Sequence, residues 1–484
     1  MVRTLALTIF LLCATAQERP RSEILRERQT RYPDLYALTE LARAAPPEFA
    51  SVALLRVAEC PRLTDPAWKH ELIEEAFQSA AGAQNTRRRA MPGGRFESSL
   101  EMNEAVAGNL ELDRISLQVR AVRDMLSVDP HAALDLFQRF DFPPPRTLTC
   151  SDALVDNVVD YYAVAGVWPT QLTAFEGPPE RRRDEAAALV KARVDAIRSH
   201  VEIAPAAAMI LNAEPSGPYE DELINSLAGV LARLPHDDRS FTASLYEITS
   251  AFAKFPRTSA IAAPDRAYLV SNLSGARCSD NLTGDWVPKV AEDAVKSFND
   301  NFSSPNDPAL APIRGEEIKA ENSGVAAVTE RIATEQEQQK FDAMFQLNFG
   351  PKGRGLTDAE KNTPEWRASF TDAVKTVGDI KQEPGESDKK FFYRKSGAFK
   401  MIVVIAPPSP ERDTAFDDYF HFLTTSDFQR DHLVQWFSEI EGAISLSASL
   451  YPKERNKRLQ EMASSGHPVL ALWARLSLVL SPQP

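Results

Sequence analysis

Residues 113–140 constrain the fold most, because they contain two amphipathic helix patterns in immediate succession. In the first pattern, apolar residues recur at spacings of four, three and four, which places them on one face of an α-helix. This stripe consists of Ile115, Val119, Val122 and Leu126. The residues expected to face away from it are Arg114, Gln118 and Arg123. The second pattern carries Ala133, Leu136, Phe137 and Phe140.

The dipeptide Asp129-Pro130 separates the two patterns and begins the second helix. The aspartate can accept a hydrogen bond from a free N–H of the first turn, and proline needs no donor at the first helical position. Because the connection is so short, the second helix must fold back antiparallel on the first. A hairpin of this size buries too little surface to be stable alone, so we expect stacked neighbours.

The same succession of short helices continues along the chain and determines the predicted fold class. The 34 prolines and 20 glycines suit many short helices better than a sheet protein with glycine-dependent turns. We predict an all-α protein, an irregular α-solenoid-like array of helical hairpins in two lobes. Its texture is similar to tetratricopeptide (TPR) and HEAT solenoids, although their consensus residues and a fixed repeat period are missing. The β-branched run at residues 401–405 is expected to be a buried helix.

Four regions are expected along the 484 residues. They are a signal peptide (1–16), an N-terminal helical array (17–275), a polar and partly irregular connecting region with a few helices (276–390), and a C-terminal helical lobe (391–484). Within the array, residues 84–108 are predicted to be an exposed loop. A helix is predicted to begin at Ser151 and to direct Val155, Val159 and Tyr162 inward.

The beginning of the sequence has the pattern of a secretory signal. Arg3 precedes an apolar run at residues 5–12, and Ala14-Thr15-Ala16 fits a small-x-small cleavage site. The alternatives are a buried helix or a membrane anchor, but a spanning helix needs about 20 apolar residues. We therefore expect a secreted or periplasmic protein whose mature chain has no transmembrane segment.

Cysteine usage allows one disulfide in the mature chain. Cys60, Cys150 and Cys278 remain after the signal, and an odd number in an oxidising compartment leaves one free thiol. Cys150 and Cys278 both stand in Cys-Ser-Asp sequences, so they are the expected pair. The alternative is three buried thiols that act as small apolar side chains.

Two groups of residues could carry metal or acid–base chemistry. His70 and Glu74 have the i, i+4 spacing that places two ligands on one face of a helix in zincin-type sites. No third ligand can be nominated, and Trp68 and Leu72 indicate an ordinary packing helix, so we expect no metal or other cofactor.

The second group is the densest cluster of histidine and carboxylate side chains. It comprises Asp417, Asp418, His421, Asp431 and His432. Asp417 and His421 share a helix face, which makes these residues the first catalytic candidates. Carboxylates near helix starts and histidines beside aromatic residues are also common in helices that only pack.

Glu97-Ser98 resembles the Glu-Ser dipeptide at the active glutamate of soluble lytic transglycosylases, whose enzymes also carry a superhelical domain. The resemblance covers two residues, and the further glycine-and-glutamine motif of that family has no counterpart downstream of Glu97, so the activity is not carried over. The sequence also contains no Gly-x-Ser-x-Gly elbow, phosphate-binding glycine loop or Cys-x-x-Cys.

The charge balance and the predicted architecture together suggest a function class. A net charge of −13 argues against binding to nucleic acid, which requires basic side chains to neutralise phosphates. Helical arrays commonly present a surface to another molecule. We expect an exported, non-catalytic binding or scaffold protein with a protein or glycan partner. The alternative is a secreted helical hydrolase, metal-dependent or glycan-cleaving, with an unrecognised site.

Overall fold

The protein is all-α in the computed structural model, as predicted. The structure describes residues 20–84, 87–89, 99–142, 144–148, 154–212, 218–235, 239–257, 259–275, 286–318, 347–349, 354–450 and 455–480. The predictions that concern the signal peptide (1–16), Glu97-Ser98, Cys150 and Cys278 lie outside these residues. Among the described residues, extended structure is confined to two three-residue strands and one isolated bridge.

The hairpin predicted at residues 113–140 is present as α6 (Arg114–Val128) and α7 (Pro130–Gln138). Asp129 connects the two helices, and its Oδ1 accepts hydrogen bonds from the N–H groups of His131 and Ala132, at 3.0 and 3.1 Å. One prediction about this segment is wrong, because Gln118 is buried instead of facing away from the core. Its side-chain nitrogen donates to the carbonyl of Phe77 on the neighbouring helix.

The first part of the chain forms two rows of helices. Its remaining helices are α1 (Arg21–Arg31), α2 (Pro33–Arg43), α3 (Pro47–Glu59), α4 (Pro66–Ala80), α5 (Ser99–Gly108), α8 (Val159–Ala165), α9 (Pro179–Asp195), α10 (Ile203–Asn212), α11 (Pro218–Arg233), α12 (Arg239–Phe252), α13 (Ala262–Gly275) and α14 (Trp286–Asn301). Short 3₁₀ helices lie at Trp168–Thr170, Leu172–Ala174, His200–Glu202 and Pro308–Leu310. In one row α3, α6, α8, α10, α12 and α14 each pack on the next, and in the other α9 packs on α11 and α11 on α13.

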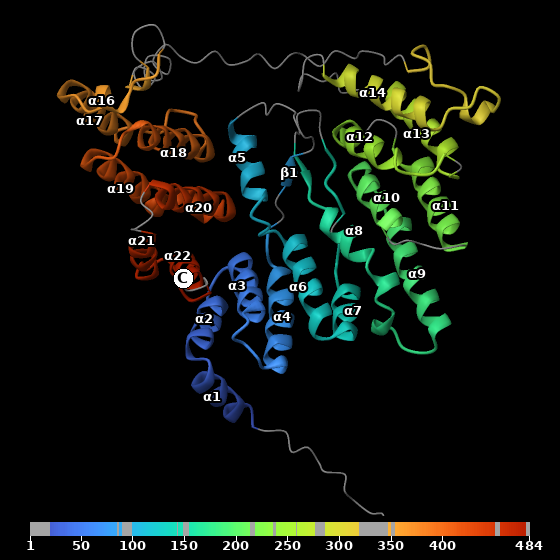
Figure 1. The fold of residues 1–484 in the computed structure, drawn as a ribbon, viewed down its shortest axis with the longest axis horizontal. Helices are drawn as coiled ribbons and strands as arrows, with labels where there is room; N and C mark the ends of the chain where they lie inside the picture. Colours follow the sequence, from blue (N-terminus) through green and yellow to red (C-terminus); the bar gives the residue numbers. More distant parts are fainter. Residues whose placement is uncertain are drawn as a thin grey trace, which may run out of the picture.

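The last part of the chain returns to the first helices. It comprises α16 (Asp358–Lys361), α17 (Pro364–Gly378), α18 (Asp388–Ile405), α19 (Pro410–Thr425), α20 (Leu433–Leu450), α21 (Arg455–Ala463) and α22 (Pro468–Leu480), with a 3₁₀ helix at Asp427–Arg430. The helix predicted at residues 401–405 is the buried end of α18. α22 packs on α2 and α3, and α18 and α20 pack on α5 (Figure 1). The division into domains and the TPR or HEAT texture stay predictions.

Two local predictions of secondary structure are wrong. Residues 84–108 contain β1 (Arg87–Arg89) and α5 instead of an exposed loop. The helix predicted to begin at Ser151 is replaced at Leu154–Asp156 by β2, which pairs antiparallel with β1, and α8 begins at Val159. Val159 is exposed, whereas Val155 and Tyr162 are buried as expected. Each strand takes its hydrogen bonds from a partner distant in sequence, which a local pattern does not reveal.

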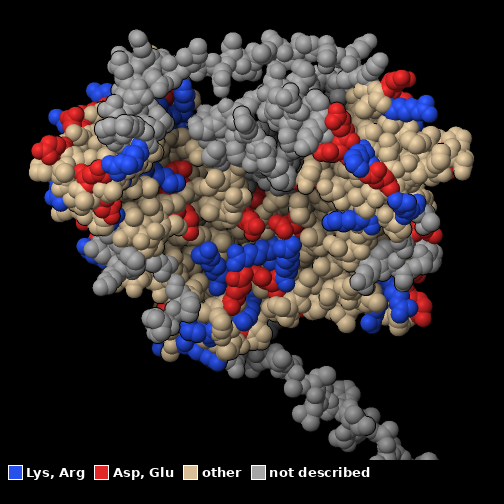
Figure 2. Space-filling model, turned by 45° about the horizontal axis from the view of Figure 1, so that its top comes forward, with Lys and Arg blue, Asp and Glu red and all other residues tan. Residues whose placement is uncertain are grey.

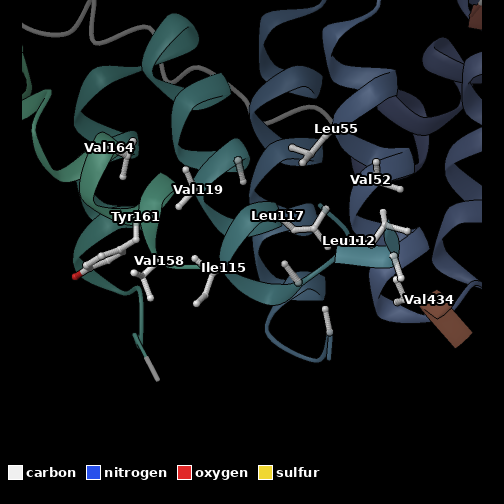
Figure 3. Close-up of a cluster of buried hydrophobic side chains, with 14 of the residues drawn as sticks. Val52, Leu55, Leu112, Ile115, Leu117, Val119, Val158, Tyr161, Val164 and Val434 are labelled. Atoms are coloured by element: carbon white, nitrogen blue, oxygen red, sulfur yellow. The ribbon is translucent and has the colours of Figure 1, made fainter. Parts of the chain in front are cut away.

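One contiguous apolar core joins both parts of the described chain. Figure 3 shows buried side chains of α3, α6 and α8, among them Val52, Val119 and Val164, together with Val434 of α20. Where the C-terminal helices meet α3, the ring of Phe49 lies 4.8 Å from Phe437 and 6.4 Å from Trp473, measured between centroids. The C-terminal helices therefore share the core of the first helices.

The surface carries both signs of charge in close proximity. Figure 2 shows Lys and Arg side chains beside Asp and Glu side chains near the centre of one face. Many of the basic groups form ion pairs between helices, such as Arg120 with Glu59 at 2.6 Å. Within the part of the chain that the structure describes, none of the helices has the length and apolar character required to cross a bilayer.

Candidate functional site

A groove of about 680 Å³ lies between α1, α2 and α4, and it is the best candidate for a ligand site in the described structure. Its volume falls in the range of about 300–1,000 Å³ that is common for ligand sites. The lining residues are Arg21, Ile24, Leu25 and Arg28 of α1, Tyr36, Glu40 and Arg43 of α2, and Trp68, Glu71, Glu74, Glu75 and Gln78 of α4.

Arg28 holds the α1 wall of the groove in place. Its Nη1 and Nη2 donate to the two carboxylate oxygens of Glu71 at 2.5 and 2.9 Å, and its Nε lies 3.4 Å from Asp65 Oδ2. The guanidinium also lies 5.4 Å from the ring centroid of Trp68. The hydrogen bonds to Glu71 raise the pKa of Arg28 above its ordinary value. α1 is strongly polar, and Arg28 is its buried residue, so this side chain replaces the apolar face that would normally dock a helix.

A second arginine ties the α2 wall to α4. Arg43 Nε and Nη2 donate to Glu75 at 2.7 and 2.8 Å, and Nη1 donates to Glu40 at 2.6 Å. Glu74 lies beside Glu75 on α4 and also lines the groove, and its Oε1 is 3.2 Å from Arg139, the residue directly after α7. Bidentate arginine–carboxylate contacts of this kind fix geometry as well as charge.

The floor of the groove is partly apolar. Tyr36 lies 6.5 Å from Trp68, centroid to centroid, and is half-buried, whereas Trp68 itself is only 2% exposed. On the α1 wall, Ile24 and Leu25 are also half-buried. The side chains available to a ligand are therefore aliphatic, phenolic and carboxylate groups, together with the exposed Arg21, Arg43 and Gln78. The lining contains no serine, cysteine or histidine.

His70 and Glu74 lie one turn apart on α4, as the sequence predicted, but only Glu74 lines the groove. Glu74 lines the groove and interacts with Arg139, while His70 is half-buried. Across the described residues, no three His, Cys, Asp or Glu side chains lie close enough together to hold a metal ion.

The cluster around residues 417–432 is spread over the surface of α19 and the start of α20. Asp417 interacts with Arg458 at 2.8 Å, and Asp418 and His421 are exposed. His432 stacks on Phe428, with ring centroids 4.5 Å apart, and burial lowers the pKa of His432. A hydrolase that uses these residues stays a prediction, and the metal content of the purified protein is its direct test.

The predicted disulfide between Cys150 and Cys278 cannot be placed, since both residues lie outside the described chain. Cys60, a cysteine within the described residues, is a buried free thiol at the end of α3. Its environment is that of a small apolar side chain.

Sequence reasoning missed a pair of carboxyl groups on α3 and α6. Burial and the neighbouring Glu59 raise the pKa of Asp124 to about 7, and Arg120 and Arg123 oppose this rise. Arg120 Nε also donates to Glu59 at 2.9 Å. The sequence signal was the one-turn spacing of Arg120 and Asp124 on the polar face of α6. Their contact with Glu59 depends on how α3 packs against α6, which the sequence does not reveal.

A second missed residue, Asp265, lies near the start of α13. Its side chain is 3% exposed, Oδ1 has no hydrogen-bond partner, and burial raises its pKa to about 8. One turn later, Tyr268 shares a 2.5 Å hydrogen bond with Nδ1 of the buried His200. A lone aspartate in a helix of mixed composition gives no sequence signal of such burial.

Comparison with known proteins yields no match, whether to a family model, to a curated protein or to a solved structure. The case for a function therefore depends on the chemistry of the groove.

Proposed function

We propose that the chain is an exported, non-catalytic binding or scaffold protein whose partner occupies the groove between α1, α2 and α4. The observation that carries this proposal is the groove itself, which combines accessible carboxylates with half-buried Ile24, Leu25 and Tyr36. Ligand sites typically join an apolar surface to a few oriented polar groups in this way. Export is supported by the signal-like pattern at residues 1–16.

A protein partner suits the groove better than a glycan. Sugar rings commonly stack on the open face of an aromatic side chain, but Trp68 is covered by Arg28 and is almost fully buried, and the half-buried Tyr36 packs against the core. Aliphatic side chains and carboxylates match the apolar and basic side chains of a polypeptide instead. We therefore take the partner to be a protein.

Site-specific photo-crosslinking in the full-length protein tests this function. A benzophenone amino acid replaces Gln78, an exposed residue that lines the groove, and in a matched control it replaces Gln460, an exposed glutamine on α21. We expect a defined protein adduct from position 78 that position 460 does not give. The adduct should weaken when Glu74→Arg is added, because this substitution reverses a charge of the groove wall.

Two results would contradict the proposal. One is the same set of adducts from both positions, and the other is no adduct from position 78 in the compartment to which the chain is exported. If position 78 gives a specific adduct, mass spectrometry of that adduct identifies the partner. Binding of the partner to the purified protein then provides a second measurement.

A further inference from the structure

We propose that the groove recognises an extended peptide segment in which a lysine or arginine stands beside aliphatic residues. This inference rests on the proposed binding function and adds the chemistry of the ligand. It follows from three observations about the groove: its length, the position of its apolar side chains, and the exposure of its carboxylates relative to its arginines.

The length of the groove sets the size of the bound segment. Along α4, the lining residues extend from Trp68 to Gln78, and ten residues of α-helix span about 15 Å. An extended chain rises by about 3.3 Å per residue, so about four to five residues fit between the ends of this row. The recognised unit is therefore a short extended segment.

The apolar side of the groove is supplied by α1. Ile24 and Leu25 are half-buried and do not belong to the contiguous core or to the side chains packed against it. Their remaining surface faces the groove, together with the half-buried Tyr36 on the floor. An aliphatic ligand side chain would cover this surface and remove it from water.

The opposite side of the groove is acidic at its surface. The side chains of Glu71 and Glu40 are 58% and 53% exposed, whereas the guanidinium-bearing side chain of Arg28 is 7% exposed. Four glutamates (Glu40, Glu71, Glu74 and Glu75) and three arginines (Arg21, Arg28 and Arg43) line the groove. The glutamates thus outnumber the arginines by one, although Arg43 is 38% exposed and Arg21 adds one exposed positive charge on the first turn of α1.

These observations together favour a basic ligand. A carboxylate has about four acceptor sites, so a glutamate that already accepts one bond per oxygen from arginine can accept another from a ligand. A lysine or arginine of the peptide would reach this row while its aliphatic neighbours contact α1. An acidic peptide would place like charges together and be rejected.

Fluorescence anisotropy with three labelled, capped nonapeptides and the full-length protein tests the inference. Each peptide has glycine–serine flanks, and the central residues are Leu-Arg-Leu, Leu-Ser-Leu or Leu-Glu-Leu. We expect the arginine peptide to bind roughly tenfold more tightly than the glutamate peptide at low salt, and this difference to shrink as salt is added.

A double variant separates recognition from folding. Glu40→Gln with Glu74→Gln removes two groove charges but leaves the Arg28–Glu71 and Arg43–Glu75 contacts intact. The matched control, Asp141→Asn with Asp427→Asn, changes the net charge equally at side chains that are 87% and 94% exposed. The groove variant should lose the preference for arginine, and the control should keep it.

Equal binding of the arginine and glutamate peptides, or an unchanged preference in the groove variant, would overturn the inference about ligand chemistry. If none of the peptides binds while the crosslink from position 78 still forms, the binding function stands and the peptide class is wrong. If the crosslink also fails, both proposals fail together.

Discussion

Arg28 shows how one side chain can determine the position of a whole helix. α1 is strongly polar apart from the half-buried Ile24 and Leu25, and its buried contact with α4 is the arginine fork on Glu71 above the Trp68 ring. Hydrogen bonds to charged groups contribute about 1.5–3 kcal/mol each, which is enough to hold a helix that would be unstable alone.

Replacing Arg28 should therefore release α1 without unfolding the rest of the molecule. In Arg28→Gln, we expect amide hydrogens of α1 to exchange at least about tenfold faster, the equivalent of about 1.4 kcal/mol, while α6 stays protected. Arg26→Gln is the matched control, since Arg26 is exposed on the same helix. Equal exchange of α1 in both variants would show that Arg28 does not hold the helix.

Asp265 makes the stability of the protein depend on pH. Burial raises the pKa of its carboxyl group from 3.8 to about 8, so between these values the folded chain retains a proton that the unfolded chain has released. The free energy of unfolding must then fall as the pH rises, by at most about 1.4 kcal/mol per pH unit for this group.

Asp265→Asn should remove this contribution, because the amide remains neutral at every pH. Urea unfolding at pH 5 and pH 8 measures the effect, and we expect the variant to lose less stability than the natural chain between the two values. Asp427→Asn, at a highly exposed position, should leave the pH dependence unchanged. If the free energy of unfolding changed equally with pH in Asp265→Asn and Asp427→Asn, Asp265 would be ionised in the folded state.

At the scale of single elements, the turn between α6 and α7 depends on one cap. Asp129 Oδ1 accepts two backbone hydrogen bonds in the first turn of α7. Asp129→Ala should lower the free energy of unfolding by about 1 kcal/mol, whereas Asp129→Ser, which retains a capping oxygen, should lower it by less. Chemical denaturation compares the two variants, and equal losses would show that the cap does not contribute.

The sequence predicted those elements whose signals are local. The Asp129-Pro130 start, the apolar stripe of α6 and the buried end of α18 all follow from residues a few positions apart. β1 and β2 were missed because each strand pairs with a segment distant in sequence, with Arg87 opposite Asp156 in the register. The burial of Gln118 was missed because its hydrogen-bond acceptor is on another helix.

The candidate site was predictable only in part. The motif at His70 and Glu74 drew attention to α4, and Glu74 does line the groove. The groove itself depends on how α1 lies against α2 and α4, and this arrangement is set by Arg28, whose sequence context is an ordinary polar helix. A single buried charged residue in a polar helix leaves no periodic pattern in the sequence.

At the scale of the whole molecule, the two ends of the described chain are joined by aromatic packing. Phe437 lies 4.8 Å from both Phe49 and Trp473, centroid to centroid, so the ring contacts α3 and α22 at once. Arg56 of α3 adds a cation–π contact, 4.3 Å from the Trp473 ring.

Phe437→Ala should therefore weaken the attachment of the C-terminal helices. Removal of a large buried ring lowers the free energy of unfolding by about 3–5 kcal/mol. We therefore expect calorimetry to show a transition at lower temperature, in which α22 separates before α3 and α6 unfold. Val404→Ala, at a valine that is 56% exposed, is the control and should have little effect. A cooperative transition at an unchanged temperature in Phe437→Ala would contradict this account.

The packing of α22 on α2 and α3 has a consequence for biosynthesis. Arg62 donates to the carbonyl of Val479, a residue 417 positions further along the chain. The opening helices thus leave the ribosome long before the segment that covers them is made, and Phe49 lacks its ring contacts with Phe437 and Trp473 throughout that interval. A nascent chain with such an uncovered surface is prone to aggregate, so its maturation should depend on a chaperone that binds this region until synthesis is complete.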